Sequence, residues 1–266
     1  MNTNQTSATR QPVLFVSHGA PLLAVHENSA TAAWRRIGAS LQRPRAVLVA
    51  SAHHDAPGPA LTGHAQPETI HDFHGFPREL YDIRYPAPGA PALAAEIRDT
   101  LASAGMPARV DAQRGIDHGV WVPLLRLFPN ADVPVLSLSV DPLRDARSQH
   151  ALGQALSALR DDGVLIVGSG SLTHNLRALD WHATASSGSE PARAFADWAQ
   201  AHIAAGRVGD LLAWEAAPQA RFNHPTPEHW LPFYIALGAA ADASAPETHA
   251  AEFEYGVLAQ HAFVWH

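Results

Sequence analysis

Seventeen histidines are the residues of this sequence best able to do chemistry. Imidazole titrates near neutral pH and is the commonest metal ligand among protein side chains. The chain has no cysteine, and all 18 of its Lys-or-Arg positions hold arginine. Thiolate chemistry, lysine Schiff bases, pyridoxal-phosphate enzymes and P-loop nucleotide binding are therefore excluded. The composition predicts a metal site built from histidine.

Three of the histidines come after predicted strands. His18 directly follows an apolar run at 12–17, His53 follows one at 46–52, and His174 lies shortly beyond one at 164–168. Ligands of open α/β sheets bind outside the carboxyl ends of the strands, so we expect these side chains at one edge of one sheet. A single histidine at a strand end is more often a hydrogen-bonded structural residue, whereas the joint placement favours a site.

Two further candidates, His118 and His229, lie in loops bounded by turn-forming residues. Pro227 before Glu228 predicts a helix N-terminus that would direct His229 toward the same edge. His54 should point away from the site, because neighbouring strand residues face opposite sides of a sheet. Surface or capping positions are expected for another group of histidines: His26, His64, His150, His182, His202, His249, His261 and His266.

The elements that must position these side chains alternate along the chain. Apolar runs at 12–17, 46–52, 133–140 and 164–168 predict buried strands, and the C-terminal stretch at 252–266 predicts a final strand. Helical patterns occupy 29–41, 90–104, 144–160, 191–205 and 230–241, and Pro/Gly-rich segments at 55–66, 85–91 and 182–190 predict loops. This order predicts a single α/β domain, with a central, mostly parallel or mixed β-sheet flanked by helices on both faces.

Charge and hydropathy narrow the class of protein further. The net charge is −7 and no basic run occurs, so nucleic acid is not an expected partner. No apolar stretch approaches the roughly 20 residues that span a bilayer. Residues 1–11 are polar and lack the apolar segment of a signal peptide, so we expect a flexible tail before one catalytic domain at 12–266. We therefore expect a cytoplasmic protein, and the low charged fraction of 16% is compatible with a homo-oligomer.

Familiar hydrolase and nucleotide-binding motifs do not account for the chain. The sequence from Gly168 to Leu172 is neither Gly-x-Ser-x-Gly nor Gly-x-Gly-x-x-Gly, so it supports neither a nucleophile elbow nor a dinucleotide site. His-Glu-x-x-His is also absent. No organic cofactor is therefore predicted.

A series of short motifs resembles the DOPA-dioxygenase-type class III extradiol ring-cleaving dioxygenases. This family includes bacterial DOPA 4,5-dioxygenase-like proteins and the plant enzymes of betalain synthesis. The motifs run in order from about residue 12 to about residue 240. They are Ser17-His18-Gly19-Ala20-Pro21, Ser51-Ala52-His53, His71-Asp72-Phe73-x-Gly75-Phe76-Pro77, Tyr85-Pro86-Ala87-Pro88-Gly89, Gly115-x-Asp117-His118-Gly119-x-Trp121, His174-Asn175-Leu176 and Pro225-Thr226-Pro227-Glu228-His229.

The resemblance implies an α/β fold with a mixed sheet and one non-haem divalent metal ion. It places metal ligands at His18, His53 and His229, with His174 as a fourth ligand or a base. Enzymes of the wider superfamily use two histidines and one glutamate, so Glu228 remains an alternative third ligand. An all-imidazole site accepts Zn²⁺, the ion often found in isolated proteins of this type, or Fe²⁺, which oxygen chemistry requires.

The same resemblance assigns catalytic roles to His174, as the base that deprotonates a catechol, and to His118, as the acid on the oxygen side. Asp117 and Asn175 would orient these imidazoles. His71, Phe73 and Tyr85 are candidates for an aromatic pocket wall, or equally for loop packing.

We therefore expect a metal-dependent extradiol dioxygenase that opens a catecholic, DOPA-like ring with O₂. Two alternatives remain open at this level. One is a zinc-dependent hydrolase with Glu228 as its base; the other is a non-catalytic metal-binding protein on the same fold. Which catechol is the substrate depends on the shape of the pocket, on which the sequence is silent.

Overall fold

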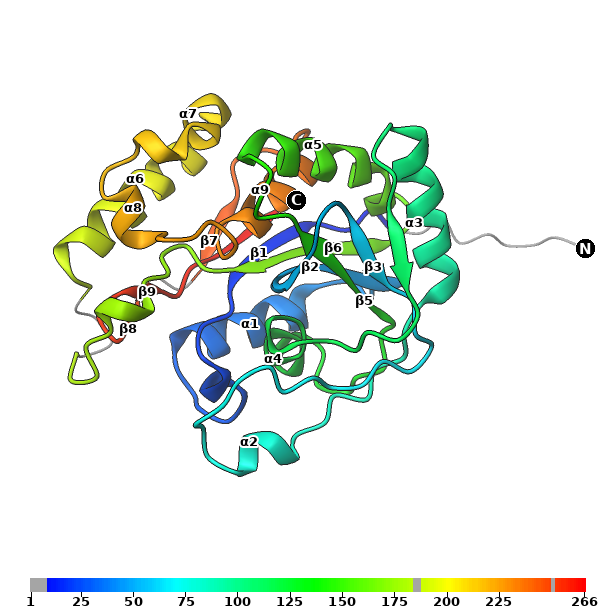
Figure 1. The fold of residues 1–266 in the computed structure, drawn as a ribbon, viewed down its shortest axis with the longest axis horizontal. Coiled ribbons are helices and arrows are strands. Elements are labelled where there is room, and N and C mark those ends of the chain that lie inside the picture. Colours follow the sequence, from blue (N-terminus) through cyan, green and yellow to red (C-terminus); the bar gives the residue numbers. More distant parts are fainter. Residues whose placement is uncertain (1–8, 184–187, 250–251) are drawn as a thin grey trace, which may run out of the picture.

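A mixed β-sheet crosses the centre of the molecule, and its inner strands are parallel (Figure 1). In this computed structural model, residues 9–183, 188–249 and 252–266 are described. Within them the main sheet has eight strands in the order β4-β3-β5-β2-β6-β1-β10-β7, and β8 and β9 form a separate pair. The strands are β1 (Val13–Ser17), β2 (Ala46–Asp55), β3 (Ala60–Thr62), β4 (Arg109–Asp111), β5 (Val135–Val140), β6 (Val164–Gly170), β7 (Glu247–His249), β8 (Phe253–Glu254), β9 (Leu258–Ala259) and β10 (Ala262–Trp265).

The inner strands are continuous apolar runs because helices cover both faces of the sheet. In β1, Val13 and Phe15 belong to one core cluster, whereas Leu14 and Val16 belong to the other. The same alternation holds in β2 and β6, where successive side chains are buried on opposite faces. The sheet therefore separates two hydrophobic layers.

Helices α3, α5 and α9 cover one face of the sheet, and α1 and α4 cover the other (Figure 1). Helices α6, α7 and α8 extend the first layer outward near α9. The α-helices are α1 (Ser29–Ser40), α2 (Glu79–Asp82), α3 (Pro91–Ser103), α4 (His118–Leu127), α5 (Ala146–Leu156), α6 (Glu190–Ala204), α7 (Val208–Leu212), α8 (Ala220–Asn223) and α9 (Leu231–Ala239). Short 3-10 turns are η1 (Pro21–Ala24), η2 (Ser157–Arg160), η3 (Leu176–Ala178) and η4 (Trp214–Ala216).

The predicted fold class is confirmed, and the mixed character of the sheet comes from its edges. Strand β10 pairs antiparallel with β1, and β3 pairs antiparallel with β5. Several short elements were not predicted: α2, α4, α7, α8, β3, β4 and β7. Helix α4 contains Pro123, which breaks the helical signal of its sequence, and the three-residue strand β3 lies inside the predicted loop at 55–66.

Other boundaries differ at the ends of elements. The helix predicted at 144–160 divides into α5 and the 3-10 turn η2. The expected tail at 1–11 lies outside the described residues as far as residue 8, and Gln11 is already buried, with its backbone N–H donating to the carbonyl of Arg160 at 3.0 Å. The predicted loop at 182–190 includes residues 184–187, which also lie outside the described residues. Among the described helices, none has both the length and the apolar character to cross a membrane.

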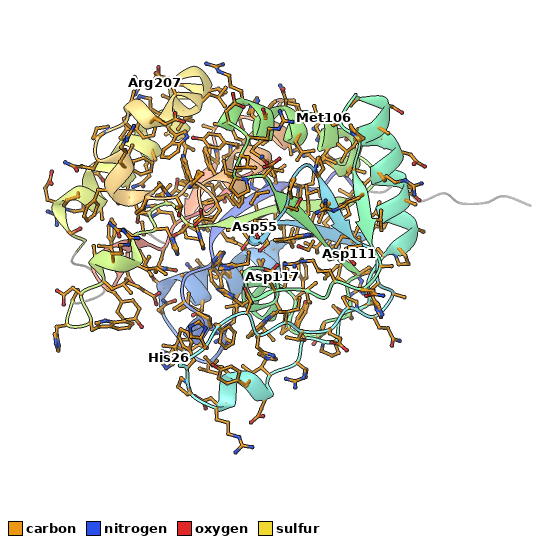
Figure 2. The ribbon with its side chains drawn as sticks, in the orientation of Figure 1. His26, Asp55, Met106, Asp111, Asp117 and Arg207 are labelled. Carbon is orange, nitrogen blue, oxygen red and sulfur yellow. The ribbon has the colours of Figure 1, made fainter. Side chains whose placement is uncertain are left out.

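Most histidines assigned to the surface are exposed or partly exposed, and Figure 2 places His26 at the periphery. His261 is the exception, with 1% of its surface exposed, so the prediction for this residue was wrong. It precedes β10 and lies between the aromatic rings of Phe253 and Phe263, and neither of its ring nitrogens has a hydrogen-bond partner among the described residues. His261 therefore occupies a buried position of the C-terminal segment that an apolar residue would be expected to fill.

We expect His261→Phe to make the protein less sensitive to acid. Burial lowers the pKa of His261 from 6.5 to about 4. Between these values the unfolded chain takes up a proton that the folded chain does not, so the stability from this group is present above pH 6.5 and is lost as the pH falls. Between pH 7 and pH 5, the free energy of unfolding should drop by about 2 kcal/mol less in the variant than in the wild type.

Urea denaturation at the two pH values measures this difference. His64→Phe is the control, since His64 is exposed and its replacement should leave the pH dependence unchanged. An identical pH dependence in His261→Phe and wild type would contradict a neutral, buried His261.

Candidate metal centre

Five histidines line one cavity of about 290 Å³ at the carboxyl ends of β1, β2 and β6. They are the five that the sequence analysis selected: His18, His53, His118, His174 and His229. Their positions in the sequence span more than two hundred residues, from just after β1 to just before α9. The fold therefore collects chemistry-bearing side chains that are far apart along the chain.

The sheet edge positions the first two histidines. His18 continues β1, and its backbone N–H donates to the carbonyl of Gly170 at 2.9 Å. Gly19 then turns the chain with a φ of +62°, a left-handed conformation that favours glycine. In β2, the pairing register with β5 shifts between Ser51 and Asp55, and His53 lies within that irregularity.

His54 faces away from the cavity, as predicted. It is 3% exposed, it is not among the lining residues, and its Nδ1 lies 3.0 Å from the hydroxyl of Ser137 in β5. The alternation of side chains along β2 therefore directs one histidine of the pair into the cavity and the other into the sheet layer.

Close backbone contacts position His229. The backbone N–H of Ser171, after β6, donates to the His229 carbonyl at 2.8 Å. A Cβ atom on Gly170 would overlap that same carbonyl oxygen, so glycine is required where β6 ends. His229 lies in a turn just before α9, close to the helix N-terminus that the sequence predicted.

His118 and His174 approach from opposite sides of this centre. His118 is the first residue of α4 and is 5% exposed. The backbone N–H of His174 donates to the carbonyl of Asn223 in α8 at 2.9 Å, which ties the loop after β6 to α8. Both loops thus depend on contacts distant in sequence.

Three ring nitrogens converge in the cavity. The Nε2 atom of His53 lies 3.1 Å from Nε2 of His18 and 3.3 Å from Nε2 of His229. Two nitrogen ligands at about 2.0–2.1 Å from one ion lie roughly 3–3.4 Å apart at octahedral to tetrahedral angles. Each of the two distances from His53 therefore fits a pair of nitrogens that bind one divalent metal ion.

The opposite nitrogen of each of these rings has its own polar neighbour. Nδ1 of His18 lies 3.0 Å from the hydroxyl of Ser169. Nδ1 of His53 lies 3.3 Å from Oδ2 of Asp72, and Nδ1 of His229 lies 3.2 Å from Oε1 of Glu228. Such outer contacts fix the tautomer and leave Nε2 available as a ligand, which is the usual arrangement of metal-binding histidines.

Burial keeps four of the five imidazoles neutral. It lowers the pKa of His18 and His229 well below the usual value, and neighbouring histidines lower it further. Burial also lowers the pKa of His53 to about 3 and that of His174 to about 4. Since a metal binds the neutral imidazole, the cluster does not need to lose protons before it binds an ion near pH 7.

Two groups in the described residues have ligand atoms within 4.8 Å of one another. One is His18, His53 and His118, and the other is His174, Glu228 and His229. The rings of His174 and His229 are stacked, with centroids 3.5 Å apart and planes at 7°. A metal ion lies near the plane of each imidazole that binds it, so two parallel, separated rings do not share one ion. This geometry does not favour His174 as a fourth ligand beside His229.

Asp72 is the residue that sequence reasoning missed. Its Oδ1 accepts a hydrogen bond from the backbone N–H of His118, and its Oδ2 accepts one from the Nδ1 of His118. Both distances are 2.9 Å. Burial raises the pKa of Asp72, but the hydrogen bonds from His118 outweigh this effect and lower it to about 2. Asp72 lies inside the motif His71-Asp72-Phe73. The sequence therefore included Asp72 in a motif but did not indicate its contact with His118.

Asp117 and Asn175 were expected to orient imidazoles, but they form hydrogen bonds with other groups. Asp117, central in Figure 2, is fully buried and accepts from the hydroxyl of Ser51 at 2.6 Å and from Arg114 at 3.3 Å. Asn175 accepts from the backbone of Arg177 and donates to the carbonyl of Phe222. Asp117 thus binds two side chains and Asn175 binds backbone groups, rather than the rings of His118 and His174.

The outer wall of the cavity is apolar. Phe73, predicted as a wall residue, lines it together with Phe76, Leu22, Leu176, Leu179, Trp181, Tyr255 and Leu258. His71 and Tyr85 do not line it; His71 lies 3.1 Å from the carbonyl of Ile83, and the hydroxyl of Tyr85 donates to the carbonyl of Phe128. These two side chains therefore contribute to loop packing, which was the alternative to a place in the pocket wall.

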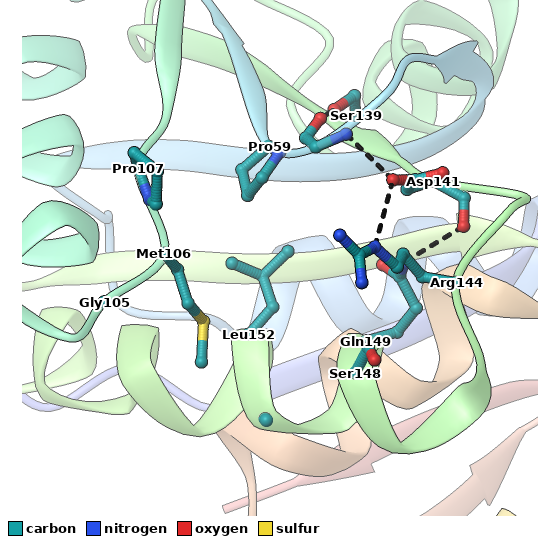
Figure 3. Close-up of a pocket in the computed structure, with 12 residues that line it drawn as sticks. Pro59, Gly105, Met106, Pro107, Ser139, Asp141, Arg144, Ser148, Gln149 and Leu152 are labelled. Carbon is teal, nitrogen blue, oxygen red and sulfur yellow. Dashed lines mark hydrogen bonds and ion pairs between the residues drawn. The ribbon is translucent and has the colours of Figure 1, made fainter.

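A second cavity, of about 410 Å³, lies between the end of β5 and the start of α5 (Figure 3). It shares no lining residue with the histidine cavity. Its polar groups are largely paired with one another and with the backbone: Asp141 accepts from the backbone of Gly58 and Leu143, and Gln149 donates to the carbonyl of Asp141. The chemistry-bearing residues are therefore concentrated in the histidine cavity.

Comparison with known proteins gives consistent matches over nearly the whole chain. The family model described as the catalytic LigB subunit of aromatic ring-opening dioxygenase matches residues 12–264. A protein of Escherichia coli (strain K12) named 4,5-DOPA dioxygenase extradiol is 40% identical over 237 residues, which cover 88% of this chain and 86% of that protein. A protein of the same name from Beta vulgaris is 39% identical over 251 residues, with 92% of each chain covered.

A solved structure agrees with this match. The crystal structure of an uncharacterized protein from Escherichia coli K12 superposes with a TM-score of 0.80 at 32% sequence identity. The match covers 96% of this chain and 99% of that chain. The predicted family resemblance is therefore confirmed.

We expect divalent ions to stabilise the folded protein through the three converging nitrogens. At Zn²⁺ concentrations about 100-fold above Kd, binding to the folded state should raise Tm by roughly 5–10 °C. His18→Ala and His229→Ala should each remove most of this increase, because each deletes one converging nitrogen.

Differential scanning calorimetry with and without Zn²⁺ measures the effect, and His64→Ala is the matched control. A full Zn²⁺-dependent increase in both His18→Ala and His229→Ala would contradict a site at these nitrogens.

Proposed function

The chain belongs to the family of catalytic LigB subunits of aromatic ring-opening dioxygenases, and from this premise we propose that it is a metal-dependent extradiol dioxygenase that opens a catecholic ring with O₂. The observation that supports this most strongly is the convergence of the Nε2 atoms of His18, His53 and His229 in one buried cavity. Two further histidines line the same cavity and are available for proton transfer.

We assign the metal ligands to His18, His53 and His229. Glu228 is the less suitable third ligand, because its Oε1 accepts from the hydroxyl of Thr226 at 2.9 Å and lies 3.2 Å from Nδ1 of His229. It is suited to orient His229 instead. His118 also has a ligand atom within 4.8 Å of those of His18 and His53, and we assign it to proton transfer, as the family resemblance implies.

The bound ion would be Fe²⁺ for oxygen chemistry, and the same three imidazoles would also bind Zn²⁺. When bound, Fe²⁺ supplies the redox contact between a deprotonated catechol and O₂. The protein supplies the ligands, the proton transfers and a cavity whose apolar wall limits the access of water.

His174 is suited to accept a proton from a catechol hydroxyl. Burial lowers its pKa to about 4, so its ring is neutral at pH 7 and carries a free lone pair. Stacking on His229 holds the ring beside the proposed ligand set.

His118 is suited to the opposite transfer, donation of a proton toward the oxygen side. Nδ1 of His118 donates to Asp72, whose carboxylate stays ionised because its pKa is about 2. A carboxylate that accepts from Nδ1 fixes the tautomer and the orientation of the ring, as in other histidine–carboxylate pairs. Nε2 is then free to take up and release a proton.

The hydrolase alternative requires a free general base beside the metal. Glu228 is the carboxylate in the right region, but its Oε1 is engaged by Thr226 and His229. Family membership favours the dioxygenase.

Ring cleavage is the expected activity of the Fe²⁺-loaded protein. Protein loaded anaerobically with Fe²⁺ and then mixed with a catechol in air should consume O₂ and form a yellow ring-opened semialdehyde. Zn²⁺-loaded protein should do neither, because Zn²⁺ has no redox chemistry. An oxygen electrode and the visible spectrum measure the two quantities, and no O₂ uptake with any of DOPA, caffeate, protocatechuate or an alkylcatechol would refute the proposal.

Replacing the proton-transfer histidines should separate turnover from metal binding. His118→Gln and His174→Gln should retain bound Fe²⁺ but lower kcat by about 10²- to 10⁴-fold, the usual contribution of a general acid or base. Metal analysis and steady-state rates on the same preparations measure both effects, with His64→Gln as the matched control. Loss of the metal from either variant would instead make that residue a ligand, and unchanged kcat would remove it from the mechanism.

A further inference from the structure

We infer that the cavity selects a catechol whose ring substituent is uncharged and apolar, an alkyl or aryl group, and that Trp181 and Leu176 at the rim contact this substituent. This inference rests on the proposed ring-opening function and names the substrate class within it.

The first observation is the charge of the wall. Among the described residues that line the cavity, none is an arginine, and the acidic one is Asp72. Both carboxylate oxygens of Asp72 are already occupied by His118, and Oδ2 also lies 3.3 Å from Nδ1 of His53. A carboxylate or ammonium on the substrate would therefore find no free ionic partner among the described lining residues.

Two arginines near the site, Arg114 and Arg126, bind other groups of the protein. Arg114 donates to the carbonyl of His53 at 2.9 Å and to Asp117 at 3.3 Å. Arg126 donates to the carbonyl of Leu23 and to Glu27. Both guanidinium groups are thereby committed to the protein. By contrast, the second cavity of the molecule contains the exposed Arg144 in its lining (Figure 3).

The second observation is the exposure of apolar side chains at the rim. Three large hydrophobic side chains are strongly exposed in the described residues, and two of them line this cavity: Trp181 at 68% and Leu176 at 58%. The ring of Trp181 lies against that of Tyr255, with centroids 4.7 Å apart and planes at 56°. An exposed apolar cluster at the mouth of a site is typical of a surface that a ligand covers.

The third observation is the composition and size of the rest of the cavity. The catechol end of the substrate must reach the ring nitrogens of the histidines, so its substituent would lie against the apolar side chains that also line the cavity, among them Phe73 and Phe76. The volume of about 290 Å³ lies near the lower end of the range for small-molecule sites. One substituted ring fits this space, with its substituent against aromatic and aliphatic side chains.

Arg177 is the cation that could oppose this inference. It follows Leu176 in η3, is exposed, and is not among the residues that line the cavity. A carboxylate-bearing substrate would need this side chain, whereas an alkyl-bearing substrate would not. The two substrate classes therefore predict different effects of replacing it.

Binding to the Zn²⁺-loaded protein tests the inference without turnover. Isothermal titration calorimetry at pH 7 should give a Kd for 4-butylcatechol about tenfold or more below those for DOPA and protocatechuate. Trp181→Ala should weaken 4-butylcatechol binding by about five- to tenfold and change DOPA binding by less than about twofold. Leu143→Ala is the matched control, because Leu143 is equally apolar, 86% exposed and outside this cavity.

Further variants address folding and the direction of selectivity. Trp181→Phe should restore most of the alkylcatechol affinity, and Trp181→Arg should reverse the preference toward protocatechuate, because it places a cation at the rim. Thermal unfolding verifies that each variant is folded. Tighter binding of DOPA or protocatechuate than of 4-butylcatechol, or weaker binding of these acids in Arg177→Gln, would overturn the inference.

The inference and the proposed function fail in different ways. If Fe²⁺-loaded protein cleaves no catechol while the Trp181-dependent binding preference holds, the ring-opening proposal is refuted and the binding selectivity stands. If the protein cleaves and binds DOPA better than 4-butylcatechol, the ring-opening proposal stands and the selectivity is refuted.

Discussion

The structure depends on holding several neutral imidazoles together in one buried place. Each ring that points Nε2 toward the centre has its Nδ1 beside a separate polar group: Ser169, Asp72 or Glu228. Without these partners the rings could rotate or exchange tautomers, and the three lone pairs would no longer converge. Burial opposes protonation of His18 and His229, since an imidazolium at either position would be both desolvated and repelled by its neighbours.

The α/β scaffold satisfies this constraint through the edge of its parallel strands. Strands β1, β2 and β6 end at the same edge, and the irregular end of β2 brings His53 into the cavity there. Gly170 lets the turn before α9 approach the end of β6, so that His229 completes the group. Asp72 binds the backbone and the ring of His118, the first residue of α4, and so holds the start of α4 beside the other histidines. The site is therefore assembled from segments that the sheet itself aligns.

The cavity has two parts with separate roles. The five histidines form a polar floor, and aromatic and aliphatic side chains form an apolar wall. The histidine floor is suited to bind a metal ion and to move protons. Among the described lining residues, the wall of Phe73, Phe76, Trp181 and their neighbours is apolar. Chemistry common to a family can thus stay in the floor, while the wall and rim set which ring is accepted.

The sequence alone determined the fold class, the main strands and helices, the five histidines of the site and the family. These follow from local information, because apolar runs, capping residues and short motifs report on neighbouring residues. It did not reveal α4, whose Pro123 interrupts the helical pattern, nor the burial of His261 between two aromatic rings. Only the tertiary structure decided that Asp72 rather than Asp117 pairs with His118, that His174 stacks on His229, and that the wall lacks arginine. Each of these depends on contacts between segments distant in sequence, whose geometry is set by packing.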